Sequence, residues 1–206
     1  MKKSDALLVI DVQNDFCPGG CLAVPEGDGV LGPINRMSGN FQTVAATRDW
    51  HPPGHASFAA SWEGKKPGDT VSIDGLNQYL WPEHCVRNTR GAQFHENLDT
   101  RPFSLVLNKG RSLKLDSYSA FFENDRKTPT GLSGYLGELG ATKVYVCGLA
   151  TDYCVFFTVM DALSLGLAVV LVEDAVRGVD LPSGGLSAAL DAMKKAGTDF
   201  LPSGKV

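Results

Sequence analysis

The residues best suited to chemistry lie in one stretch, Val144-Tyr-Val-Cys-Gly-Leu-Ala-Thr-Asp-Tyr-Cys-Val155. Its β-branched apolar start predicts a buried strand, which Gly148 interrupts. Thr151 and Asp152 are helix-capping residue types, so we expect Cys154 in the first turn of a helix. The positive end of the helix dipole would lower the pKa of this thiol, and unpaired N–H groups there could hold an oxyanion. From this stretch alone a buried structural cysteine is the more common case, and the rest of the chain has to favour a nucleophile over it.

Composition limits the class of protein that carries this cysteine. The chain has 206 residues, of which 43% are hydrophobic and 20% charged, as expected for a single globular domain spanning 1–206. Its net charge of −4 disfavours nucleic-acid and acidic-membrane partners. The basic start, Met1-Lys2-Lys3, precedes an apolar run too short for a signal peptide, and no run approaches membrane-spanning length. Five cysteines, an odd number, then indicate reduced thiols in the cytoplasm.

Apolar runs alternate with helical patterns along the chain. We expect strands near 6–10, 41–47, 104–108, 143–147, 167–172 and 198–201, and helices near 28–40, 132–139, 155–165 and 186–196. This alternation predicts an α/β fold with three layers, a central parallel sheet of about six strands and helices on both faces. Residues 12–20 form a loop in which Asp15 is expected to be a solvated or capping acid. Residues 49–95 show little periodicity, which is typical of a long functional loop region.

Reactive side chains follow the first four expected strands. Sites in open α/β sheets form beyond the carboxyl ends of the strands, and those ends present Asp11, Asp49 with His51, Lys109 and Cys154. Each residue could be ordinary on its own, for example as a loop cap or a solvated amine. Their gathering at one sheet edge favours a nucleophile, a base and a charge-balancing group that act together.

A second set of residues has the composition of a metal site. Asp49, His51, His55 and His84 include three of the four histidines in the chain. The Asp-x-His spacing places two ligands on the same side of an extended segment, and a Pro-Pro-Gly turn can return His55 toward them. Imidazole and carboxylate ligands suit Zn²⁺, Fe²⁺ or Mn²⁺ better than Ca²⁺ or Mg²⁺. The spacing is compatible with a site for one divalent metal ion, although from spacing alone surface histidines remain the default.

At these residues the chain resembles the nicotinamidases, within the isochorismatase-like cysteine hydrolase superfamily. The matching segments are Val9-Ile-Asp-Val-Gln-Asn-Asp-Phe16, Thr47-Arg-Asp-Trp-His51, Leu80-Trp-Pro-Glu-His-Cys-Val86, Lys109-Gly110, Asp116-Ser-Tyr-Ser119 and Gly148-Leu-Ala-Thr-Asp-Tyr-Cys-Val155. They follow the family's order over nearly the whole chain, and together they are highly specific. The chain departs from the family at Arg87-Asn88-Thr89, where a glycine commonly precedes the threonine, so the conformation of this loop stays open.

The resemblance implies a role for each residue. It implies a catalytic triad of Asp11, Lys109 and Cys154, and a metal held by Asp49, His51, His55 and His84. It also implies an oxyanion hole formed by the backbone amides of Ala150 and Cys154, next to a cis peptide bond between Leu149 and Ala150. The remaining implied positions surround a pyridine ring: Phe16 and Trp81 on its two faces, and Tyr118 nearby.

The activity implied by the resemblance is hydrolysis of nicotinamide to nicotinate and ammonia through a cysteine thioester, in NAD salvage. Nicotinamide would then be the partner, without nucleic acid or membrane, and the sequence is compatible with a homo-oligomer. One alternative is an isochorismatase-like or N-carbamoyl-amine hydrolase, although these generally lack the Asp49, His51 and His84 pattern. Another is a non-catalytic metal-binding or thiol-sensor protein, which leaves Asp11 and Lys109 without a role.

Overall fold

The predicted three-layer α/β fold is confirmed by the computed structural model, which describes residues 2 and 4–206. Met1 and Lys3, part of the basic start considered above, lie outside the described residues. The described residues form a six-stranded parallel sheet in the order β5-β2-β1-β6-β7-β8. The strands are β1 (Asp5–Ile10), β2 (Thr43–Asp49), β5 (Leu105–Lys109), β6 (Lys143–Leu149), β7 (Ala168–Arg177) and β8 (Asp199–Leu201).

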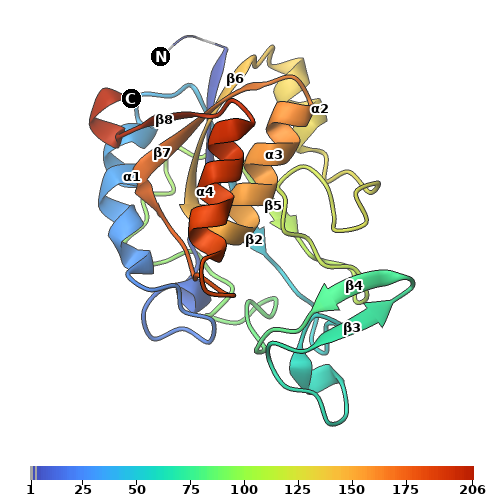
Figure 1. Ribbon diagram of the computed structural model, residues 1–206. Coiled ribbons are helices and arrows are strands. Elements are labelled where there is room, and N and C mark those ends of the chain that lie inside the picture. Colours follow the sequence, from blue (N-terminus) through green and yellow to red (C-terminus); the bar gives the residue numbers. More distant parts are fainter. Residues whose placement is uncertain (1, 3) are drawn as a thin grey trace.

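Helices cover both faces of the sheet (Figure 1). One face carries α1 (Leu31–Ser38), which follows a 3₁₀ turn at Gly27–Val30. The other face carries α2 (Leu132–Glu138), α3 (Phe156–Ser164) and α4 (Gly185–Lys195). Each helix lies within a few residues of its expected position. None of these helices combines the length and the apolar character needed to cross a membrane, within the part of the chain that the structure describes.

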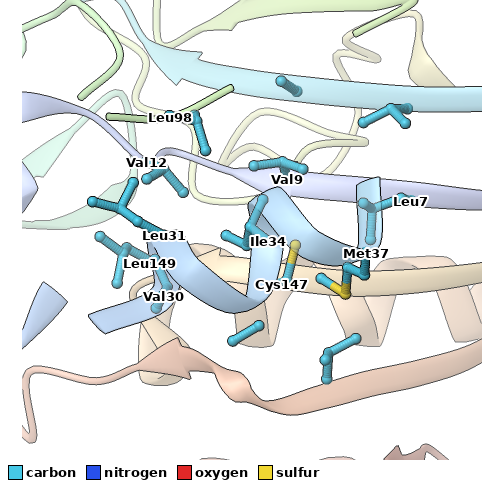
Figure 2. Packing of buried hydrophobic residues seen from close by; sticks show 14 of the residues in the cluster. Leu7, Val9, Val12, Val30, Leu31, Ile34, Met37, Leu98, Cys147 and Leu149 are labelled. Carbon is cyan, nitrogen blue, oxygen red and sulfur yellow. The ribbon is translucent and has the colours of Figure 1, made fainter. Parts of the chain in front are cut away.

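The two-sided cover explains why β1 is a continuous apolar run. Leu7 and Val9 point to the α1 face, where Figure 2 shows them beside Ile34 and Met37, whereas Leu8 and Ile10 point to the opposite face. All four side chains are fully buried. Alternate residues of a strand point to opposite faces, so a strand covered on both sides needs apolar residues throughout.

A two-stranded antiparallel hairpin was not predicted. It consists of β3 (Thr70–Ile73) and β4 (Leu76–Tyr79) and lies within the 49–95 region, away from the central sheet (Figure 1). Polar and apolar residues alternate in β3 but not in β4, and each strand has only four residues, so the pattern is too short to identify the pair from sequence. Gln78 is buried and reaches Asp116, which ties the hairpin to the loop after β5.

The strand order brings reactive residues that are far apart in the sequence to one edge of the sheet. The chain moves outward from β1 to β2 and β5, then returns to β6 and continues through β7 to β8, so the order reverses between β1 and β6. Asp11 follows β1, and the turn that holds Cys154 follows β6. Ligands of open α/β sheets bind at such a reversal, outside the carboxyl ends of the strands.

Candidate active site

Lys109 is the centre of a fully buried polar cluster. Its Nζ lies 2.8 Å from Asp11 Oδ2 and 3.4 Å from Cys154 Sγ, donates to Ser117 O at 2.8 Å and forms a short hydrogen bond with Asp49. Asp49 and Lys109 are register partners at the carboxyl ends of β2 and β5. Burial acts to lower the pKa of Lys109, but the carboxylates of Asp11 and Asp49 raise it well above its usual value. The amine is therefore a permanent ammonium ion.

Asp11 is arranged to accept a proton. Its backbone has a φ of 48°, a conformation that residues other than glycine seldom adopt. Oδ1 accepts a hydrogen bond from Thr47 Oγ1 at 2.7 Å, whereas Oδ2 is buried without an aligned hydrogen-bond donor. An Asp11 oxygen and Cys154 Sγ lie within 4.8 Å of each other. Burial outweighs the ammonium of Lys109 and raises the pKa of Asp11 to about 6.

Cys154 lies in the first turn after β6, as expected, but this turn has π-helical hydrogen bonding over Thr151–Val155. The peptide bond between Leu149 and Ala150 is cis, as the resemblance implied. The expected lowering of the thiol pKa is wrong. Burial raises the pKa of Cys154 well above its usual value; the charge of Lys109 opposes this rise, and the carboxylates of Asp11 and Asp49 add to it. The resting cysteine is therefore a thiol, which needs a base.

A second cluster shares Asp49 with the first. Asp49 Oδ2 faces His51 Nε2 at 3.6 Å and His84 Nε2 at 3.9 Å, and His84 arrives from the long loop as expected. Burial acts to raise the pKa of Asp49, but Lys109, His51 and His84 together lower it, so this carboxylate stays ionised. One oxygen thus faces the ammonium and the other faces two imidazoles.

These three residues fit a divalent cation. His51 Nδ1 contacts Gly110 O at 2.9 Å and His84 Nδ1 contacts Pro82 O at 2.7 Å, so each Nδ1–H donates and each Nε2 lone pair faces Asp49. His51 Nε2 is buried without a partner among the described residues. Gly110 has a φ of 61°, and a Cβ there would lie 2.5 Å from the His51 ring, so only glycine permits this contact.

His55 lies beside Asp49, His51 and His84, in a second group of possible ligands. Its ring stacks on His51 with centroids 4.3 Å apart. Possible ligand atoms of His51, His55 and Asp116 lie within 4.8 Å of one another. His55 Nδ1 contacts Ser57 Oγ at 2.7 Å, and its Nε2 contacts Leu115 O at 3.4 Å. Both ring nitrogens therefore already have partners within the protein. The structure brings three of the four predicted ligands to one point.

An apolar cavity opens between the two clusters. Phe16, Trp81, Tyr118 and Tyr153 line it, together with Asp49, His84, Ala150 and Cys154. Trp81 Nε1 donates to Tyr118 Oη at 3.0 Å, which fixes both rings, and Phe16 packs against His84 with centroids 5.6 Å apart. The cavity thus combines aromatic walls with a thiol and a possible cation ligand, and it suits a small planar ring.

Known proteins resemble this chain over most of its length. Residues 5–203 match the isochorismatase domain family. The chain belongs to the isochorismatase family. It is 44% identical over 198 residues to the nicotinamidase of Acinetobacter baylyi, covering 96% of this chain and 92% of the relative. It is 45% identical over 196 residues to the nicotinamidase of Escherichia coli, covering 93% of this chain and 92% of the relative.

Solved structures of the isochorismatase family agree with the fold over the full chain. A nicotinamidase/pyrazinamidase of Acinetobacter baumanii has a TM-score of 0.96 at 44% identity, covering 100% of this chain and 99% of the other. A protein from L. infantum in complex with nicotinate has a TM-score of 0.86 at 40% identity, covering 99% and 96%. A pyrazinamidase of Pyrococcus horikoshii in complex with zinc has a TM-score of 0.80 at 35% identity, covering 97% and 99%.

The structure of this isochorismatase family member adds supporting residues that the sequence analysis missed. Gln13 is fully buried; its amide donates to Asp49 O at 2.8 Å and accepts from Asp49 N at 2.8 Å. Asp15 is not a solvated acid, because it is buried and its carboxylate accepts from Cys85 N at 2.7 Å. Asp15 thereby joins the Phe16 loop to the His84 loop. Both Gln13 and Asp15 lie within the matching segment 9–16, and their presence there was the available signal.

The structure also tests the expected helix cap after β6 and the open conformation of the loop at Asn88. Neither Thr151 nor Asp152 caps the helix; Asp152 instead accepts from Val179 N and Asp180 N, because the first turn is π-helical and its carboxylate faces another loop. Asn88 stands where the family commonly has glycine, and its φ is 68°. Asparagine tolerates this left-handed conformation better than most residues, so the loop keeps a glycine-like backbone.

Proposed function

We propose that this chain hydrolyses the carboxamide of nicotinamide to nicotinate and ammonia, as a step of NAD salvage. One observation carries the proposal: the Cys154 thiol lines a cavity with aromatic walls, and the Asp11 carboxylate and the Lys109 ammonium lie beside that thiol. A small planar amide fits such a cavity, and a thiol beside a base suits acyl transfer. The names of the relatives support nicotinamide as the substrate.

In the first half-reaction, Asp11 takes the thiol proton while Cys154 Sγ attacks the carboxamide carbon. The electron pair of the C=O bond moves onto oxygen, and we assign the backbone amides of Ala150 and Cys154 to that oxyanion. Losing one donor of this kind costs about 2.7–4 kcal/mol in other enzymes. The positive charge of Lys109 stabilises the developing thiolate, which compensates for burial of the thiol.

Collapse of the oxyanion then breaks the C–N bond and completes the first half-reaction. Asp11 returns its proton to the nitrogen, which leaves as ammonia, and the carbonyl stays on sulfur as a thioester. In the second half-reaction, water attacks the thioester while Asp11 takes a proton from the water. Nicotinate then leaves, and Asp11 returns the proton to the sulfur of Cys154. The single carboxylate serves both half-reactions because it gives up the first proton to ammonia before it takes the second from water.

Asp49, His51 and His84 would hold a divalent cation beside the cavity, and we propose zinc. Burial acts to lower the pKa of His51, but Asp49 and Asp116 raise it, so this position attracts positive charge. When bound, the cation supplies a Lewis acid that can hold the pyridine nitrogen and orient the ring. We assign His55 to the support of His51, since its nitrogens bond elsewhere.

Removal of the cation tests this assignment and the activity together. We expect the purified protein to release nicotinate and ammonia in equal amounts, to lose this activity on dialysis against a chelator, and to regain it with added zinc.

His84→Ala should abolish stoichiometric metal binding, measured by elemental analysis, because it removes one of three donors. His55→Ala and the control His95→Ala should each retain one metal ion. Loss of metal from His55→Ala would instead make His55 a fourth ligand.

The raised pKa of Asp11 predicts an acid limit on activity. Only the ionised carboxylate can accept the thiol proton, so kcat/KM should level off about one pH unit above an apparent pKa of about 6 and fall about tenfold per unit well below it. Rate profiles over this range, at substrate well below KM, measure it. Enzyme returned from low to neutral pH should recover fully, which separates titration from unfolding. A profile that stays flat to pH 4 would exclude Asp11 as the base.

A further inference from the structure

The segment between β7 and α4 supplies one wall of the cavity. We call residues 178–184 the strap; its Val179 lines the cavity, whereas residues 180–184 are exposed and Leu181 is 49% exposed. The strap belongs to neither the sheet nor a helix, so its position depends on what holds it. A wall carried by such a segment can recede more easily than one carried by a strand.

Two residues beside the nucleophile hold the strap. Asp152 Oδ1 accepts from Val179 N at 3.0 Å, and its Oδ2 accepts from Asp180 N at 2.8 Å. Tyr153 Oη donates to Leu181 O at 2.5 Å. Asp152 and Tyr153 directly precede Cys154 in the π-helical turn. Three hydrogen bonds therefore join the strap to the turn that carries the sulfur.

The contacts of these two residues suit a positioning role. Asp152 is 9% exposed, and it has no ion-pair partner among the described residues, so backbone N–H groups stabilise its charge. The Tyr153 ring lines the cavity and packs edge-on against Trp81, with centroids 4.8 Å apart. Close packing also holds the root of the strap, because a Cβ on Gly178 would lie 2.6 Å from Leu186 Cδ1.

We propose that Asp152 and Tyr153 are positioning residues that hold the strap against the cavity, so that Val179 sets the largest aromatic carboxamide the site accepts. The inference rests on the proposed function, because the ring that meets this wall is that of the substrate. With the ties removed, the wall recedes: a ring the size of nicotinamide loses contact, and a larger ring gains room. The carboxylate of Asp152 and the hydroxyl of Tyr153 act through Val179 and not on the reacting atoms.

The test compares two substrates in three variants. Nicotinamide and its benzo-fused analogue quinoline-3-carboxamide are each assayed as substrate and as competitive inhibitor. In Asp152→Ala and Tyr153→Phe, we expect KM for nicotinamide to rise about threefold to tenfold, the range that loss of one or two hydrogen bonds supports, with a much smaller change in kcat. The preference for nicotinamide over the analogue should fall by a similar factor. Val179→Ala should lower the preference directly.

Hydrogen exchange provides a readout that does not depend on activity. Amide exchange within residues 178–184 should accelerate in Asp152→Ala and Tyr153→Phe but not in Val179→Ala, because only the first two remove the ties. Asp174→Ala is the matched control: Asp174 accepts from Ser203 N and Ser203 Oγ at 2.6 Å and does not line the cavity. It should leave the preference and the exchange of the strap unchanged.

The outcomes separate this inference from the proposed function. If the unaltered protein hydrolyses nicotinamide but Asp152→Ala and Tyr153→Phe keep its preference, the role of the strap is wrong and the function stands. A fall in kcat alone, with KM and preference unchanged, would also overturn the inference, because it would place both residues in alignment of Cys154. If the unaltered protein turns over neither carboxamide, the proposed function fails first.

Discussion

Cys154→Ala is expected to lower kcat for nicotinamide hydrolysis by about four to six orders of magnitude, as removal of a nucleophile does in other covalent hydrolases. The reason is that no other described thiol lies with Asp11 and Lys109; the sulfur of Cys154 is 3.4 Å from Lys109 Nζ. Alanine fits the same turn, so the fold should persist. The measurement is ammonia release from protein made in a host without nicotinamidase activity.

Cys147→Ala is the matched control for this variant. Cys147 is fully buried in β6, where its Sγ contacts Leu8 O at 3.4 Å, and it lies outside the cavity. Its loss should cost about 1 kcal/mol of stability and leave kcat within about twofold. Retention of a tenth or more of normal activity in Cys154→Ala would exclude Cys154 as the nucleophile.

Lys109→Met is expected to abolish activity and also to destabilise the protein strongly. Methionine has similar length but removes the ammonium from between Asp11 and Asp49, which are almost completely buried. Breaking a buried ion pair from one side typically costs about 3–5 kcal/mol, because an uncompensated charge remains. For a chain of this length the melting temperature should fall by about 10 °C. Calorimetry measures this change.

A second substitution separates charge from packing. Adding Asp11→Asn to Lys109→Met removes one uncompensated carboxylate, so it should restore part of the lost melting temperature while activity stays absent. Arg101→Met serves as the control, because Arg101 forms an exposed pair with Asp99 and should leave the melting temperature unchanged. A melting temperature of Lys109→Met within about 2 °C of the unaltered protein would contradict a buried charge cluster.

The sheet could be predicted from sequence because burial on both faces leaves a continuous apolar run, as in β1 and β6. The site could be predicted because parallel strands end at one edge, which brings Asp11, Lys109 and Cys154 together despite their separation in sequence. Such a prediction needs only strand ends and residue types. It needs no knowledge of the loops between them.

What sequence could not supply depends on contacts between loops. The role of Asp152 could not be read from a local pattern, because its acceptors face Val179 and Asp180 from another part of the chain. The thiol pKa was predicted with the wrong sign because helix-terminal position is local, whereas burial and the nearby carboxylates arise only on folding. The hairpin of β3 and β4 was also missed, because each strand has only four residues and apolar alternation is confined to β3.

The most direct test of the account is whether the sulfur of Cys154 meets a carbonyl carbon on a pyridine ring held in the cavity. Nicotinaldehyde labelled with carbon-13 at its carbonyl is bound to the protein and observed by NMR. We predict that the carbon-13 signal moves to the region of a tetrahedral carbon bonded to sulfur with the unaltered protein and does not move with Cys154→Ala. An aldehyde that binds the unaltered protein with its carbonyl signal unchanged, or a tetrahedral adduct that persists in Cys154→Ala, would contradict it.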